Sequence, residues 1–283
     1  MGKTVAQRHN LDGIVKAGEM IEVRQSSALT LHDRRVLNLL IRHAGEHIAA
    51  TVEHVMPMRH LRSPTHRGGE RVRDSIERLM TTLVLVPTRD SKGNKATRRT
   101  ALLSDTTTTD DEDNPQGELR YSFSPTMRDI LQQSQYWGRI KPHVMFAFST
   151  KYALALYEAL CLRRNLTRTD EILSIEEFRE VLSVPPDKLK GFAQFKQTAI
   201  TPAVKEINAL SDFDLVVEPV RQGGQQRGTL TGFRLRWELK DPDQWDKVQA
   251  ELGRSKVGRQ ARIRRTAESA ILPYLADNTL KIL

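Results

Sequence analysis

The sequence has little of what disulfide bonding, export or membrane insertion requires. Its 283 residues contain a single cysteine, Cys161, so disulfides and cysteine-based zinc sites are excluded. A packed thiol is expected at this position rather than a nucleophile. No apolar run approaches the roughly 20 residues that span a bilayer, and the N-terminus lacks the charged-then-apolar pattern of a signal peptide. These absences predict a cytoplasmic protein with no membrane partner.

Motifs for catalysis and for cofactor binding are also missing. No GxxxxGK[ST] loop occurs, and Gly2-Lys3-Thr4 lacks the preceding strand and the first glycine of a phosphate-binding loop. The eight histidines are scattered, without a His-Glu-x-x-His motif or the His-hydrophobic-His pair of strand-cleaving initiators. The sequence therefore predicts no metal site, no cofactor and no enzymatic activity.

What the sequence does have is an excess of positive charge. The formal net charge is +9, and residues 1–100 alone carry 18 basic and 10 acidic side chains. Such a surplus favours a polyanionic partner, nucleic acid before a membrane. The length suffices for two ordinary domains, each with a sizeable core.

The run from Gly191 to Leu210 has two faces at helical spacing. The apolar face consists of Phe192, Phe195, Ala199, Ala203, Ile207 and Leu210. The polar face consists of Gln194, Gln197, Thr198, Thr201, Lys205 and Asn208. These side-chain types read base edges or bind phosphates in a major groove, although a solvated face is the ordinary alternative for an isolated helix.

Pro202 leaves the geometry of this helix open. Either the helix bends at Pro202, or Thr201 caps a new helix with the proline at its first position. The second case would leave only Lys205 and Asn208 on the inserted helix and would remove the glutamines from it.

The flanking segments favour a DNA-binding fold. A buried helix at 149–164 precedes a short strand at 171–173 and a helix begun by a capping box of Ser174 and Glu177. Two strands at 213–219 and 229–238 enclose a hairpin tip with two arginines and no acid. This order is that of a winged helix-turn-helix, whose third helix enters the major groove. Lys190, Arg221 and Arg227 join the helix face as candidate DNA contacts.

The first half of the chain predicts the same order. Thr30 with Asp33 begins a helix to about His43, and residues 69–80 form an amphipathic helix in the position of a recognition helix. Its outward residues, which are candidate DNA contacts, are Arg71, Arg73, Ser75 and Arg78. Pairing of these arginines with neighbouring acids on the same helix is the ordinary alternative.

Three strands are predicted after this helix, at 83–87, 98–104 and 118–124. Between the last two lies the stretch 105–117, where four threonines are followed by four acids. It is expected to be a disordered loop that points away from DNA, since it has little to bury and repels phosphates.

Several segments, in order, resemble the initiator replication proteins of iteron-bearing plasmids. They are Leu29-Thr-Leu-His-Asp-Arg-Arg-Val-Leu-Asn-Leu-Leu40, Gly117-Glu-Leu-Arg-Tyr-Ser-Phe-Ser-Pro125, Lys151-Tyr-Ala-Leu-Ala-Leu-Tyr-Glu158, Phe195-Lys196 with Pro202-Ala-Val-Lys-Glu-Ile-Asn208, and Gly232-Phe-Arg-Leu235. The resemblance covers roughly residues 10–238. It implies two tandem winged-helix domains that bind repeated origin sequences in double-stranded DNA and help to open the origin. It also implies a self-dimer through the first domain and recruitment of the host initiator and replicative helicase.

The predicted fold class is α+β, with two tandem winged helix-turn-helix domains and a basic helical C-terminal tail. The predicted divisions are an arm at 1–28, a first domain at 29–134, an interdomain segment at 135–148, a second domain at 149–238 and a tail at 239–283. The basic run at 254–265 is either a solvated helix, an additional backbone contact or a partner site. A transcriptional repressor with the same fold is the alternative function, and a strand-cleaving relaxase is a third class.

Overall fold

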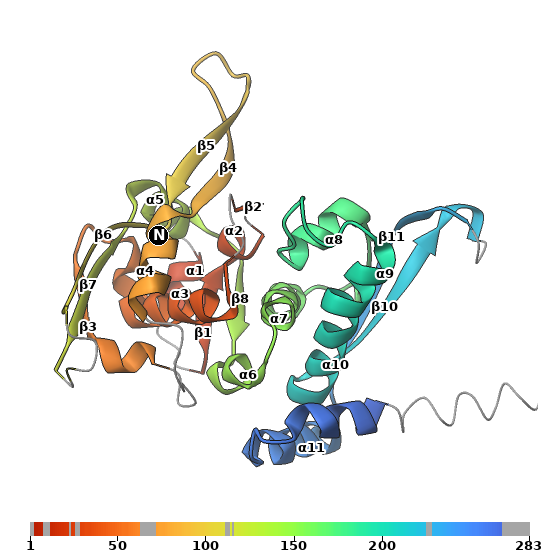
Figure 1. Ribbon diagram of the computed structural model, residues 1–283. Helices are drawn as coiled ribbons and strands as arrows, with labels where there is room; N and C mark the ends of the chain where they lie inside the picture. The colour runs from red at the N-terminus through yellow and green to blue at the C-terminus, as the bar shows by residue number, and fades with distance from the viewer. Residues whose placement is uncertain are drawn as a thin grey trace, which may run out of the picture.

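The computed structural model describes residues 3–7, 12–22, 24–25, 29–62, 72–110, 114, 116–224 and 228–267. Figure 1 shows two halves, one on each side of α7 (Lys151–Arg163), and a long hairpin projects from each half. Within the described residues, no helix combines the length and the apolar character needed to cross a bilayer.

The first half contains short helices around three small sheets. In chain order its elements are α1 (Lys3–Ala6), β1 (Ile14–Ala17), α2 (Gly18–Ile21), β2 (Arg24–Gln25), α3 (Leu31–Ala44), η2 (Gly45–Ala49), β3 (His54–Pro57), η3 (Met58–Leu61), α4 (Val72–Thr81), β4 (Leu83–Arg89), β5 (Lys95–Ala101), β6 (Leu103–Thr108), β7 (Glu118–Phe123), α5 (Pro125–Gln133), β8 (Trp137–Ile140) and α6 (Pro142–Ala147). The capping box predicted for Thr30 and Asp33 begins α3, because each side chain binds the backbone N–H of the other residue.

The second half follows α7 and ends in an additional helix. Its elements are β9 (Asp170–Ser174), α8 (Ile175–Val181), α9 (Phe192–Phe195), η4 (Lys196–Ile200), α10 (Thr201–Leu210), β10 (Phe213–Arg221), η5 (Gln222–Gly224), β11 (Leu230–Leu239) and α11 (Pro242–Gly253). Ser174 and Glu177 form the expected capping box at α8. Phe178 and Phe233 meet in the core with ring centroids 4.8 Å apart, which ties α8 to the sheet.

Both halves place three strands in the same order. The sheets run β3-β7-β6 in the first half and β9-β11-β10 in the second. In each sheet the first strand in chain order, β3 or β9, pairs with the second strand of the hairpin, β7 or β11. This agreement confirms the two winged helices expected from sequence. The hairpin β4–β5, which pairs with β2, is inserted between α4 and β6 of the first half only.

Three expectations about the first half are wrong in detail. The strand predicted at 98–104 is two strands, since β5 ends at Ala101 and β6 begins at Leu103. Strand β6 also takes in residues 105–108 of the predicted loop, because β-branched threonines suit a strand and these residues pair with β7. The acidic residues 111–113 lie outside the described residues.

The third correction concerns the predicted N-terminal arm. Strand β1 is buried at all four positions and pairs with β8 from the interdomain segment. Burial of Ile14, Val15 and Ala17 removes apolar surface from water, so this part of the arm belongs to the folded core.

Helix α7 is buried on nearly every side, because elements of both halves pack against it. It contacts α2, α3 and β8 on one side and α8, η4 and α10 on the other. Cys161 on this helix is fully enclosed, and burial raises the pKa of its thiol. The packed-thiol expectation is therefore confirmed.

A buried ionic cluster joins α7 to the first half. The Glu158 carboxylate accepts hydrogen bonds from Lys16 Nζ at 2.9 Å, Arg34 Nη1 at 3.0 Å and Asn38 Nδ2 at 2.7 Å. Arg34 also donates to the Ser183 hydroxyl at the end of α8. Burial raises the pKa of Glu158, but the two cations and Asn38 outweigh this effect and lower it below its ordinary value.

We predict that Glu158→Gln destabilises the full chain by about 3 kcal/mol, because it leaves Lys16 and Arg34 buried without a countercharge. Chemical denaturation at neutral pH measures the change. Arg236→Gln is the matched control, since it breaks an exposed pair with Glu218 and should cost less than about 1 kcal/mol. Equal losses in the two variants would show that the buried cluster contributes no more than a surface pair.

Candidate nucleic-acid interface

The predicted recognition helix is continuous from α9 through α10. Residues 196–200 form a π turn, in which the Thr201 N–H donates to the Lys196 carbonyl instead of to residue 197. Ile200 and Thr201 have helical backbone angles, and no side chain caps a new helix there. The wider turn accommodates Pro202, which lacks an N–H and whose ring crowds the carbonyl four residues earlier. Of the two alternatives, a new helix capped by Thr201 is thus wrong, and the glutamines stay on the helix.

One face of this helix is buried and the other is open. Phe195, Ala199, Ala203, Ile207 and Leu210 are enclosed in the core. The exposed polar residues of the N-terminal half are Gln194, Lys196, Gln197 and Thr198, and Lys190 is exposed just ahead of it. Thr201 and Lys205 are half-buried farther along.

Asn208 does not belong to the open face. Its side chain exchanges two hydrogen bonds with the backbone of Leu215, from Nδ2 to the carbonyl at 2.9 Å and from the Leu215 N–H to Oδ1 at 2.7 Å. These bonds hold the start of β10 against the helix. The predicted polar face therefore ends before this residue.

The turn that precedes the helix is held by Arg179 of α8. Its guanidinium donates to the carbonyls of Leu189 at 2.8 Å and of Pro185 at 2.9 Å, and also to that of Lys188. Arg179 lies 5.2 Å from the ring centroid of Phe195 as well. These contacts fix the direction in which the helix leaves the turn, and so position its exposed face.

The wing of the second half begins at Arg221. This side chain donates to the Gly228 carbonyl at 2.8 Å and lies over the Phe192 ring at 5.8 Å from its centroid. The wing base is therefore packed against the first turn of the recognition helix. Arg227 lies outside the described residues.

In the corresponding helix of the first half, α4, the described candidate side chains bind other residues of the protein. Ser75 is buried, and its hydroxyl lies 2.7 Å from His32 Nδ1, so the expectation that it faces outward is wrong. Arg73 donates to the backbone carbonyls of Thr109 at 3.2 Å and of Asp110. Arg71 lies outside the described residues.

Arg78 is held by a buried acid. Its guanidinium makes a forked contact with Asp33, with Nε at 3.1 Å and Nη2 at 2.9 Å from Oδ1. Burial raises the pKa of Asp33, but hydrogen bonds from Arg78, Ser75 and Thr30 outweigh it and lower the pKa below 3.8. Arg78 thus joins α4 to the beginning of α3.

The wing of the first half is acidic where that of the second is basic. By the shared strand order, the β6–β7 connection at 109–117 corresponds to the β10–β11 connection at 222–229. The first contains Asp110, Asp111, Glu112 and Asp113, whereas the second contains Arg227 and no acid. The described start of the acidic connection lies beside α4 through Arg73, although we expected it to point away from the DNA-facing surface.

The inserted hairpin β4–β5 carries cations that the sequence analysis did not single out. Its exposed basic residues are Arg89, Lys92, Lys95, Arg98 and Arg99. Asp90 closes the turn by accepting from the backbone N–H groups of Lys92 and Asn94, each at 2.9 Å. Gly93 adopts a φ of +84°, which favours glycine. The run from Asp90 to Asn94 is a turn signal that could have located this hairpin.

Comparison with known families assigns both halves. The model of the family described as "Initiator Replication protein, WH1" matches residues 13–161, and that described as "Initiator Rep protein, WH2" matches residues 174–237. The chain belongs to the initiator Rep protein family. The WH1 match includes β1 and most of α7, so it extends beyond both ends of the first domain predicted from the sequence. The family and its two winged-helix domains agree with the resemblance found in the sequence, and the initiator is a DNA-binding protein of replication initiation.

Solved structures similar to the initiator include domains 2 and 3 of RctB. One crystal structure, of a selenomethionine derivative, has a TM-score of 0.46, 14% identity, and coverage of 76% of this chain and 85% of that one. A second has a TM-score of 0.43, 14% identity, and coverage of 78% and 87%. No curated protein sequence matches the initiator.

We predict that Asp33→Asn destabilises the initiator by about 1–3 kcal/mol at neutral pH, since Arg78 and the α3 cap lose a charged acceptor. Folding lowers the pKa of Asp33. The charged carboxylate therefore contributes its full stabilisation at pH values above 3.8, and this contribution disappears as the pH falls through the pKa of the folded state. The difference between wild type and variant should therefore shrink in acid, as measured by denaturation across the pH range. Asp129→Asn, at an exposed position of α5, is the control and should change stability by less than about 0.5 kcal/mol at each pH.

Proposed function

We propose that this initiator binds directly repeated sequences, or iterons, at a plasmid origin, and that it performs no covalent chemistry. The observation that carries the proposal is the open face of the helix at 192–210. Gln194, Gln197 and Thr198 are exposed there, while the opposite face is fixed in the core. Amides and hydroxyls in such an array hydrogen-bond base edges in a major groove.

Phosphate contacts surround this face in the proposed complex. Lys190 precedes the helix, Lys205 follows the exposed amides and Arg221 lies at the wing base; Arg227 joins them from its position in the sequence. Contacts of this kind supply affinity and position the protein, whereas base contacts supply sequence preference.

The first domain contributes phosphate contacts through its inserted hairpin. Arg73 and Arg78 already bind the protein's own carbonyls and carboxylate, and Ser75 is buried, so α4 offers little that is free to read bases. The β4–β5 hairpin projects from the body of the domain in Figure 1, and it carries the five exposed cations. In the proposed complex these cations lie along the backbone of the same duplex.

The family resemblance extends the proposal to the steps that follow binding. Binding to an array of repeats strains the adjacent DNA and promotes origin opening. The host initiator and the replicative helicase are then recruited, and self-association occurs through the first domain. We place these activities in the cytoplasm.

Selection of bound sites from random duplexes, followed by footprinting on the recovered plasmid origin, tests the proposal. We expect several directly repeated sites of one sequence. A single inverted repeat at a promoter would instead identify a repressor. Incubation with supercoiled origin DNA and Mg²⁺ should leave it supercoiled, and a nicked or covalently joined product would refute the absence of enzymatic chemistry.

Two triple variants should separate base reading from phosphate binding. Gln194→Ala, Gln197→Ala and Thr198→Ala together should abolish the preference for the repeat over random DNA without changing the salt dependence of binding. Lys92→Gln, Lys95→Gln and Arg98→Gln together should keep the preference but lower the slope of log K against log salt by about 2.7, at roughly 0.9 for each contact. Identical behaviour of the two variants in anisotropy titrations would contradict this division.

A further inference from the structure

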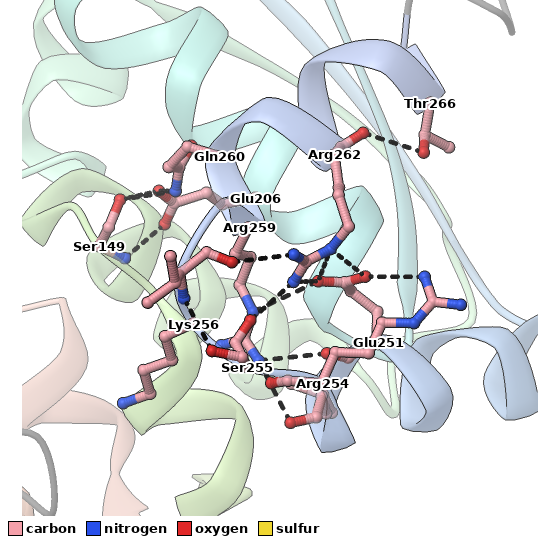
Figure 2. Close-up of polar contacts among 12 residues, drawn as sticks. Ser149, Glu206, Glu251, Arg254, Ser255, Lys256, Arg259, Gln260, Arg262 and Thr266 are labelled. Carbon is pink, nitrogen blue, oxygen red and sulfur yellow. Dashed lines mark hydrogen bonds and ion pairs between the residues drawn. The ribbon is translucent and has the colours of Figure 1, made fainter.

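The chain beyond β11 lies outside both family matches, yet its described residues, 240–267, are folded onto the second domain. Figure 2 shows Glu251 of α11 at the centre of three arginines. Arg262 Nη2 lies 2.6 Å and Arg254 Nη1 3.3 Å from the Glu251 carboxylate, and Arg259 Nε lies 3.5 Å from it. Hydrogen bonds from Arg262 are the main cause of the lowered pKa of Glu251, so the carboxylate is charged at neutral pH.

Other contacts fix the helical residues 259–267 in place. Arg259 Nη2 donates to the carbonyls of Glu251 at 3.1 Å, Leu252 at 3.2 Å and Arg254 at 3.0 Å, which satisfies the C-terminal end of α11. Gln260 donates to both Ser149 and Glu206 at 2.9 Å, which joins this segment to α10 and to the start of α7 (Figure 2). The segment is therefore a built part of the domain.

A groove of about 590 Å³ lies between the C-terminal end of α10, α11 and the helical residues 259–267. The cations that line it are Lys240, Lys247, Arg254, Arg262 and Arg265, and the single acid among the lining residues is Glu251. Lys240 is committed to the interior, because its ammonium donates to the carbonyls of Asn208, Ser211 and Phe213. The other four leave a surplus of positive charge over one carboxylate.

The charge at the rim of the groove is available to a ligand. Lys247 and Arg265 are exposed and make no ion pair with any residue that the structure describes, and the Arg254 side chain is 63% exposed. The lining also includes Ala209 and Ala250, which are small and uncharged. A chain of anionic groups can therefore approach closely while several cations surround it.

The groove lies at the C-terminal end of the helix whose N-terminal half carries the exposed amides. It is formed on the helix that carries Gln197, and Ala209 in its lining follows Gln197 by about 18 Å at 1.5 Å for each residue. That separation is shorter than one helical turn of duplex DNA, about 34 Å. A duplex that occupies the exposed face can thus bring a neighbouring stretch of its backbone to the groove.

We propose that this C-terminal groove binds the phosphate backbone of duplex DNA that flanks the repeat. The inference rests on the proposed function, because it needs a duplex held at the face of the helix at 192–210. The ligand class is a duplex phosphate backbone, and Lys247, Arg254 and Arg265 supply the contacts.

The test compares the full-length protein with a groove variant, Lys247→Gln, Arg254→Gln and Arg265→Gln together. The control variant, Arg42→Gln, Arg234→Gln and Arg236→Gln together, loses the same charge at exposed positions on α3 and β11. Binding to an origin repeat with flanking duplex is measured against salt concentration. The groove variant should lower the slope by about 2.7, at roughly 0.9 for each contact, and the control should not.

Shortening the DNA locates the contact. On a duplex that ends at the repeat, the wild-type slope should fall to that of the groove variant. Equal slopes and affinities for the groove and control variants on the long duplex would overturn the proposal. That result would hold against the proposal even if the groove were found to bind an acidic protein. Loss of repeat preference by the wild type itself would instead refute the proposed function. Thermal melting, monitored by circular dichroism, checks that both variants fold.

Discussion

Glu158 is a single buried carboxylate on α7 to which two cations and an amide from the first domain converge. Apolar packing around α7 is non-directional and could tolerate a small rotation between the domains. The carboxylate is less tolerant, because Lys16, Arg34 and Asn38 must each keep hydrogen-bonding distance in a medium of low dielectric constant. Removal of the carboxylate leaves two cations buried without a countercharge. The cluster therefore specifies one arrangement of β1 and α3 relative to α7.

One further layer of packing connects that arrangement to the helix at 192–210. Helix α7 packs directly against η4 and α10, and Ser149 before it binds Glu206 of α10. Arg34, a member of the cluster, also donates to Ser183 at the end of α8. The open face at 194–198 is thus connected to the first domain by packed side chains rather than by a flexible linker. Two domains that act on one duplex need such a fixed separation, because half-site spacing is a geometric property of the protein.

Much of the fold is readable from sequence because its signals are local. The capping boxes at Thr30 and Ser174, the apolar periodicity of 192–210 and the alternation of 229–238 each belong to one continuous helix or strand. The errors arise where long-range contacts decide. Ser75 is polar and lies among arginines, yet His32 gives it a partner 43 residues away in the interior. Asn208 matches the polar face in spacing, but its side chain completes the backbone of Leu215. No local pattern distinguishes such residues from solvent-facing ones.

The two winged helices share a topology but differ in electrostatics. The wing of the second domain is basic, whereas the β6–β7 wing of the first contains consecutive acids, which phosphates repel. Two additions to the repeated topology carry positive charge instead: the β4–β5 hairpin, with five exposed cations, and the folded segment after β11. In the proposed complex, charge on a projecting hairpin or a peripheral groove would contact the DNA backbone without constraining the residues proposed to read bases. Under that proposal the fold gains affinity at these additions, and the sequence preference is left to the helix at 192–210.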